Sequence, residues 1–270
     1  MLENKKIGFL GAGLMAEAIA RGLLKAGVSP ERINASDPED RRRELFQREL
    51  GIKTSADNAA LAEFADIVIL AVKPFVVSQA IADAGGKIGP RHLLISIAAG
   101  VKTETIESKA EGKIPVVRVM PNTPSLIGEG VSAIAPGRHA GPADLDAARG
   151  IFEAVGKVVQ VTEDKMDAVT GLSGSGPAFV YMFIEALADG GVRAGLPKAM
   201  ALMLAAQTVA GAAGMVLETG EHPAVLRDRV MTPGGTTVAG VAALERSGFR
   251  SAAIEAVTAA TNRSAELGKQ

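Results

Sequence analysis

The feature that most constrains the fold of this chain is the stretch from residue 5 to residue 20. A short apolar run is followed by Gly-Ala-Gly-Leu-Met-Ala at 11–16, and apolar residues then recur at helical spacing. Gly11 allows a tight turn, Gly13 lets the backbone approach a pyrophosphate, and Ala16 keeps the helix close to the strand. The free amides at the start of that helix are expected to face the phosphates. The stretch therefore predicts a strand–turn–helix unit that binds a dinucleotide.

Composition limits the kinds of ligand and macromolecule that this chain can bind. The 270 residues are enough for two domains, and 29 basic residues nearly balance 30 acidic ones. The basic run at 41–43 lies among acids, which is typical of a solvated helix face. With one Tyr and no Trp, the chain has few stacking platforms for nucleic acid, and without Cys it has no disulfide or Cys-ligated metal. We expect a cytoplasmic protein with no nucleic-acid partner, no metal and no signal peptide.

Strand-like and helix-like runs alternate through the first part of the chain. The run at 66–72 is apolar and β-branched, which is typical of a strand covered on both faces. After it, a hairpin-like pair of strands is expected at 131–134 and 157–161, around a helix at 142–155. This alternation predicts an α/β fold, a Rossmann-like doubly wound parallel sheet over residues 1–162. Its other strands are expected at 32–36, 52–54, 93–97 and 116–120, and its other helices at 38–50, 58–64, 76–84 and 103–109.

From about residue 164 the strand-like runs disappear. Several of the later segments carry small residues on more than one face, and a helix that is apolar nearly all round must be buried. Five helices have too little interior to bury such faces, so residues 163–270 are predicted to form an all-α dimerisation domain; a compact monomeric bundle is the alternative. The uncharged segment 199–217 approaches membrane-spanning length, but its Ala, Gly and polar residues favour a buried helix. The helices are expected at 164–194, 197–219, 222–230, 236–246 and 250–267.

Ligands of open α/β sheets gather at the carboxyl ends of the strands. Asp37 stands where an acid accepts a hydrogen bond from a ribose 2′-hydroxyl and repels a 2′-phosphate. Alternatively, Asp37 caps a helix that starts at Pro38, and Ser36 with the arginines at 41–43 could hold a phosphate. The sequence therefore does not separate NADH from NADPH. The loop 120–124, Met-Pro-Asn-Thr-Pro, is equally compatible with a ligand-binding role and a rigid turn.

Two glycine-rich stretches mark the helical part. Residues 167–178 place three glycines and a proline in an expected helix, where each interior Gly costs about 0.5–1 kcal/mol relative to Ala. A close helix crossing or a ligand would explain that cost. At 233–237, Pro-Gly-Gly-Thr-Thr leads into a helix, so the amides of Gly235, Thr236 and Thr237 are expected to be unpaired and to bind an anion such as a carboxylate. An ordinary Thr-capped helix start is the alternative.

These motifs resemble those of the pyrroline-5-carboxylate reductase family over essentially the whole chain. The resemblance implies reduction of 1-pyrroline-5-carboxylate to L-proline by NADPH or NADH, the final step of proline biosynthesis. It also implies homodimers with interleaved helical domains, often assembled into a decamer. The motifs that carry it are 11–16, 71–74, 96–100, 120–124, 167–178 and, most specifically, 230–237.

The family resemblance also implies roles for individual residues. The substrate is expected to contact Gly235, Thr236 and Thr237, with Glu163 a weaker candidate. The amides at 235–237 hold its carboxylate, and the hydroxyl of Thr237, the predicted catalytic residue, bonds its ring nitrogen. Lys73 could donate a proton but fits cofactor packing better. The nucleotide is expected to contact Leu10, Gly11, Ala12, Gly13, Leu14, Met15, Ser36, Asn58, Ala71, Val72, Lys73 and Ala99, with Asp37 in the ribose place.

Two other functions compete with this prediction. The 3-hydroxyacid dehydrogenases share the N-terminal turn and a helical domain, but they resemble this chain less because they use a lysine in a glycine-rich helix. The corresponding stretch here, 171–178, contains no Lys. A non-catalytic nucleotide-binding protein is the alternative from another class, and it has no use for two threonines beside an anion site.

Overall fold

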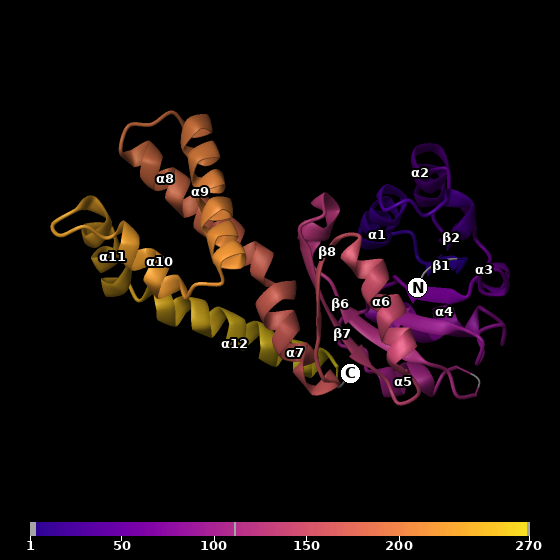
Figure 1. The fold of residues 1–270 in the computed structure, drawn as a ribbon. Coiled ribbons are helices and arrows are strands. Elements are labelled where there is room, and N and C mark those ends of the chain that lie inside the picture. Colours follow the sequence, from indigo (N-terminus) through magenta and orange to yellow (C-terminus); the bar gives the residue numbers. More distant parts are fainter. Residues whose placement is uncertain (1–3, 111, 269–270) are drawn as a thin grey trace. The chain divides into compact units, whose positions relative to one another are not determined.

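The computed structural model describes residues 4–110 and 112–268 (Figure 1). The chain divides into two compact units, one formed by the residues up to 175 together with those from 259 onward, the other by residues 176–258. The division into domains at 162 and 163 stays a prediction.

An eight-stranded sheet forms the frame of the first unit, with the strand order β3-β2-β1-β4-β5-β6-β7-β8. Every neighbouring pair is parallel except β6 and β7. The chain winds outward from β1 in both directions, so the order reverses between β1 and β4, which confirms the doubly wound arrangement. The strands are β1 (Ile7–Leu10), β2 (Ile33–Ser36), β3 (Lys53–Ser55), β4 (Ile67–Leu70), β5 (Leu93–Ser96), β6 (Val116–Met120), β7 (Gly130–Pro136) and β8 (Gly156–Gln160).

The last two strands are not the expected hairpin. They pair in parallel, and the helix α6 (Pro142–Glu153) connects them, while β7 runs antiparallel to β6. A helical crossover returns the chain to the same end of the sheet, so the strands that it joins are parallel. Gly156 lies opposite Gly130 with φ +149°, and a Cβ atom there would lie 1.9 Å from the carbonyl oxygen of Gly130. Position 156, where β8 lies against β7, therefore requires glycine.

Helices cover both faces of the sheet (Figure 1). Ile67 and Ile69 of β4 pack on one side, in the cluster that includes side chains of α1 (Leu14–Lys25), α2 (Asp40–Leu50) and α6. The intervening Val68 and Leu70 pack on the other side, against α3 (Asn58–Phe64), α4 (Val77–Ala82) and α5 (Thr103–Glu107). Successive residues of β4 thus enter opposite cores, which confirms a strand covered on both faces. Short 3₁₀ turns occur at Pro30–Arg32, Pro74–Val76, Thr123–Ile127 and Glu163–Lys165.

The predicted helix at 164–194 is not one continuous α-helix. It consists of α7 (Met166–Val169), a π-helical turn (Thr170–Gly174) and α8 (Gly176–Arg193). In the π turn the amide of Ser175 donates to the carbonyl of Thr170 at 2.8 Å. A Cβ atom on Gly174 would lie 2.6 Å from Cε of Met120, so this glycine lets the turn approach the end of β6. The close neighbour of the glycine-rich stretch at this point is therefore a strand end and not a second helix, which was one of the two expected explanations.

The second unit consists of helices only. α8 and α9 (Lys198–Thr219) pack through small side chains, with Ala188, Ala201 and Ala205 at the centre. Many larger apolar side chains stay exposed; Leu217, for example, is 76% exposed. Among the described helices, α9 alone is long and apolar enough to cross a membrane by length and composition, and 11% of its most apolar stretch is buried. The remaining helices are α10 (Pro223–Val230), α11 (Thr236–Arg246) and α12 (Phe249–Leu267), whose last turns belong to the first unit.

Candidate active site

A cleft of about 870 Å³ opens at the carboxyl ends of β1, β2, β4, β5 and β6. Its position is that of a ligand site at the switch point of an open α/β sheet, and its volume lies in the range of small-molecule sites. Sequence reasoning did not assign the loop residues 120–123 or Gly174 to the cofactor, yet they line the cleft too. Of the predicted nucleotide contacts, all but the buried Ala12 line it: Leu10, Gly11, Gly13, Leu14, Met15, Ser36, Asp37, Asn58, Ala71, Val72, Lys73 and Ala99.

The glycine turn has the geometry that a pyrophosphate needs. Gly11 has φ +96°, and a Cβ atom there would lie 2.7 Å from the carbonyl oxygen of Ala71, so only glycine fits. Gly13 is the N-cap of α1 and carries no capping side chain, and the space beside it is open. The first amides of α1, at Leu14 and Met15, have no acceptor within the helix. The residues present therefore fit the phosphates of a dinucleotide.

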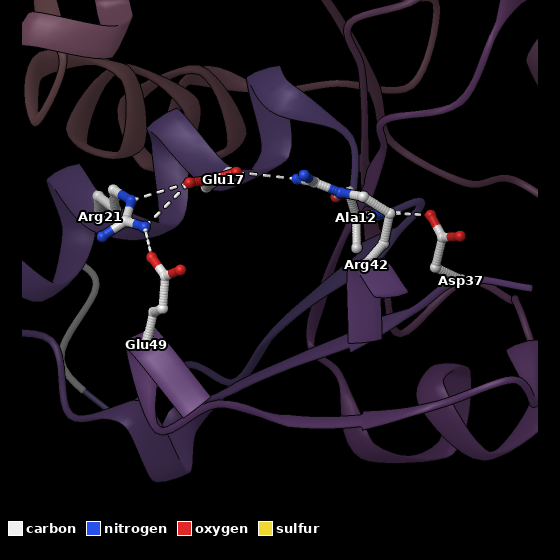
Figure 2. Close-up of polar contacts among 6 residues, drawn as sticks. All are labelled: Ala12, Glu17, Arg21, Asp37, Arg42 and Glu49. Atoms are coloured by element: carbon white, nitrogen blue, oxygen red, sulfur yellow. Dashed lines mark hydrogen bonds and ion pairs between the residues drawn. The ribbon is translucent and has the colours of Figure 1, made fainter. Parts of the chain in front are cut away.

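Asp37 binds the glycine turn and does not cap α2. The helix begins at Asp40 with Glu39 as its N-cap, so the expected start at Pro38 is wrong. One carboxylate oxygen of Asp37 accepts from the amide of Ala12 at 2.7 Å, and the other from the amide of Glu39 at 2.9 Å. Figure 2 shows the contact with Ala12, which draws the end of β2 against the turn after β1.

A network of charges fixes Arg42 beside Asp37 (Figure 2). Its Nε donates to the carbonyl of Ala12 at 2.6 Å, and its Nη2 donates to the carboxylate of Glu17 at 2.9 Å. Glu17 also accepts from Arg21 of the same helix. Burial is the largest single influence on Glu17 and raises its pKa, but the hydrogen bonds and charges of Arg42 and Arg21 together outweigh it, so the pKa is lowered from its ordinary 4.5.

The lowered pKa of Glu17 makes folding stability depend on pH. The contribution of Glu17 is present above its unfolded pKa of 4.5 and is lost as the pH falls through the lower folded pKa. We expect Glu17→Gln to lower the free energy of unfolding by about 1–3 kcal/mol at neutral pH. That difference should shrink below pH 4.5, as urea denaturation over a pH series would measure. Glu49→Gln is the control, because Glu49 is more exposed and its ion pair within residues 4–110 and 112–268 is with Arg21 alone. An equal loss at all pH values would contradict the prediction.

The loop at 120–124 is both rigid and part of the cleft. Asn122 donates from Nδ2 to the carbonyl of Ser173 at 3.1 Å and accepts at Oδ1 from the amide of Val131 at 2.9 Å. Its side chain thus holds the π turn and the start of β7 together. Ser36 and Asn58 are similarly fixed, because the hydroxyl of Ser36 donates to Oδ1 of Asn58 at 2.7 Å. The residues that line this end of the cleft are preorganised by such internal hydrogen bonds.

Glu163 lies away from the cleft. Its carboxylate accepts from the amide and the hydroxyl of Thr103, both at 2.7 Å, and Arg118 lies 3.5 Å from it. Arg118 is 5% exposed on β6, so Glu163 provides the charge partner of a buried arginine. No local pattern predicts this pair, which joins residues 45 positions apart. The substrate contact of Glu163 stays a prediction.

The start of α11, in the second unit, presents two threonines. Gly234 has φ +69°, and the amide of Gly235 donates to the carbonyl of Thr232 at 3.0 Å. The expectation that the Gly235 amide is unpaired is therefore wrong, because the turn before the helix uses it. Thr236 and Thr237 are the first residues of α11, so their amides have no acceptor within the helix. Within residues 4–110 and 112–268, their hydroxyls make no side-chain hydrogen bond.

Comparison with known proteins assigns the chain to a family. Residues 163–267 match the family model described as pyrroline-5-carboxylate reductase dimerisation, and residues 6–100 match that of NADP oxidoreductase, coenzyme F420-dependent. The whole chain is 52% identical to all of the pyrroline-5-carboxylate reductase of Methanosarcina acetivorans. The chain belongs to the pyrroline-5-carboxylate reductase family. This confirms the resemblance of its motifs, and the matched regions confirm a nucleotide-binding sheet followed by a helical dimerisation domain.

Solved structures of the family share the fold. The pyrroline-5-carboxylate reductase of Coxiella burnetii is 37% identical with a TM-score of 0.92, over 97% of this chain and 98% of that one. The Plasmodium falciparum enzyme, with NADP bound, is 32% identical with a TM-score of 0.88, over 98% and 99% of the two chains. The dimerisation region includes α9 and its exposed apolar side chains, which supports a second subunit as the surface that covers them.

Proposed function

We propose that the chain reduces 1-pyrroline-5-carboxylate to L-proline with NADPH or NADH. The observation that carries this is the 52% identity to a pyrroline-5-carboxylate reductase over the full length. A bound reduced nicotinamide would supply the hydride for the imine carbon. A proton adds to the ring nitrogen, so the C=N double bond becomes a single bond.

We assign each anion to one helix N-terminus. The pyrophosphate binds in the cleft at the start of α1, where Gly13 leaves space. The substrate carboxylate binds the amides of Thr236 and Thr237, and the Thr237 hydroxyl bonds the ring nitrogen. The role of Gly235 is to leave room for the turn, because a Cβ atom there would lie 2.4 Å from Oγ1 of Thr232 and distort the turn. Since a protonated imine is already electrophilic, positioning and electrostatics supply the catalysis without a dedicated general acid, and Lys73 packs against the nucleotide.

Turnover by the wild-type protein tests the assignment. We expect the absorbance of NADH or NADPH to fall when 1-pyrroline-5-carboxylate is added, with L-proline formed in equal amount. A 3-hydroxy acid with the oxidised nucleotides is the comparison substrate, and we expect no reaction with it. Absence of L-proline with both nucleotides would contradict the proposed function, and oxidation of the hydroxy acid would favour the dehydrogenase alternative.

We further propose that dimers of this cytoplasmic protein assemble into a decamer. The exposed apolar side chains of α8 and α9 support association, because single chains rarely leave so much apolar surface in water. Light scattering after gel filtration is expected to give the mass of a decamer. A dimer would contradict the higher assembly alone, and a monomer would also contradict the argument from apolar helices.

A further inference from the structure

The rim of the cleft beyond β2 is acidic. Asp37 and Glu39 both line the cleft there. Each oxygen of the Asp37 carboxylate accepts only one backbone amide among the contacts described above, so each keeps a free lone pair. A ribose 2′-hydroxyl can donate to such an oxygen, whereas a 2′-phosphate carries about −1.5 to −2 charges near neutral pH and is repelled.

Two nearby arginines, Arg42 and Arg43, are already bound within the protein, and the exposed Arg41 does not line the cleft. Arg42 also lines the cleft, but the carbonyl of Ala12 and the carboxylate of Glu17 hold its guanidinium, and its side chain is 19% exposed. Arg43 donates to the carbonyls of Asp37 and Pro38 and pairs with Asp40. Recognition of a phosphate by arginine uses the paired N–H groups of the guanidinium fork. Arg42 can bind a 2′-phosphate with its paired N–H groups only after its ion pair with Glu17 is broken.

From these contacts we infer that this cleft selects NADH over NADPH. Asp37 causes the selection together with Arg42, whose guanidinium is held by Glu17. The inference rests on the proposed function for its cofactor and adds which of the two nucleotides is preferred. Asp37 is the specificity-determining residue, because it lines the cleft at the end of β2, where the ribose of a dinucleotide is expected. Glu17 is a positioning residue that acts through Arg42, since the ion pair keeps the guanidinium on the glycine turn.

Binding of each nucleotide to the protein without substrate is the direct test, by titration calorimetry. We expect the wild type to bind NADH about tenfold or more tightly than NADPH, the effect of one nearby like charge. Asp37→Asn removes that charge and retains one acceptor oxygen, so the preference should fall about tenfold. The control is Glu44→Gln, which also removes one negative charge, at a residue outside the cleft that pairs with Arg48, and should leave the preference unchanged.

A second pair of variants tests the role of Glu17. Glu17→Gln weakens the hold on Arg42 and should tighten NADPH binding severalfold with little change for NADH. Glu49→Gln, at the far end of the same network, should change neither. Tighter NADPH binding by the wild type, or an unchanged preference in Asp37→Asn, would overturn the inference. Selective NADH binding without turnover of 1-pyrroline-5-carboxylate would support it and contradict the proposed function alone.

Discussion

Thr237→Ala is expected to lower kcat about 10²–10³-fold while the protein stays folded. Removing one preorganised donor to a developing charge has an effect of this size in other enzymes. The hydroxyl of Thr237 makes no side-chain hydrogen bond within residues 4–110 and 112–268, and the residue is half-buried, so its loss costs the fold little. Steady-state rates with 1-pyrroline-5-carboxylate, together with thermal denaturation, measure both parts of the prediction.

Two neighbouring variants separate the hydroxyl of Thr237 from the helix start itself. Thr237→Ser keeps a hydroxyl on the same carbon and should restore most of the rate. Thr236→Ala leaves both amides in place, so we expect a smaller loss, seen mainly in KM. Full activity in Thr237→Ala would remove the residue from the mechanism, and a collapse of the melting temperature would show that its role is structural.

The sheet could be predicted because its signals are local. A buried parallel strand such as β4 is a continuous apolar run, and the glycine turn after β1 has its own spacing. The parallel pairing of β7 and β8 follows from the helix between them, although the sequence suggested a hairpin. The reversal at β6 and β7 depends on the loop at 120–124, whose Asn122 is fixed by contacts with residues 9 and 51 positions away.

Side-chain partners in the site were less predictable. Asp37 has the sequence neighbours of a helix cap, but one of its carboxylate oxygens accepts a hydrogen bond from the amide of Ala12, 25 positions away. Glu163 likewise meets Thr103 across 60 positions. Tertiary packing decides whether a short polar side chain bonds a local donor or a distant one. Sequence periodicity and motif spacing carry no information about that packing. For Gly235 a local contact was missed instead, because its amide donates to the carbonyl of Thr232 in a turn that the motif did not reveal.

Gly13→Val is expected to weaken nucleotide binding about 100-fold with little effect on the stability of the protein. Gly13 has φ −68° and ψ −180°, a backbone conformation open to any residue, and no heavy atom lies within 4 Å of the position that its Cβ would take. The change in unfolding free energy should therefore stay within about 1 kcal/mol, most of it from replacing glycine at the N-cap of α1. At Gly11, by contrast, φ +96° and the nearby carbonyl of Ala71 make any side chain costly to the fold.

The valine at position 13 would occupy the space that the pyrophosphate needs beside the first amides of α1. Because forcing extra methyl groups into occupied space costs up to about 3 kcal/mol, we expect the affinities for NADH and NADPH to fall about 100-fold, and equally. Calorimetric titration measures the affinities, and Gly89→Val is the matched control, since Gly89 also has open space and lies outside the cleft. Equal loss is the informative part, because the pyrophosphate is common to both nucleotides, whereas Asp37 distinguishes them. Unchanged affinity in Gly13→Val would mean that the phosphates do not lie at this helix, and the binding site would have to be sought elsewhere in the cleft.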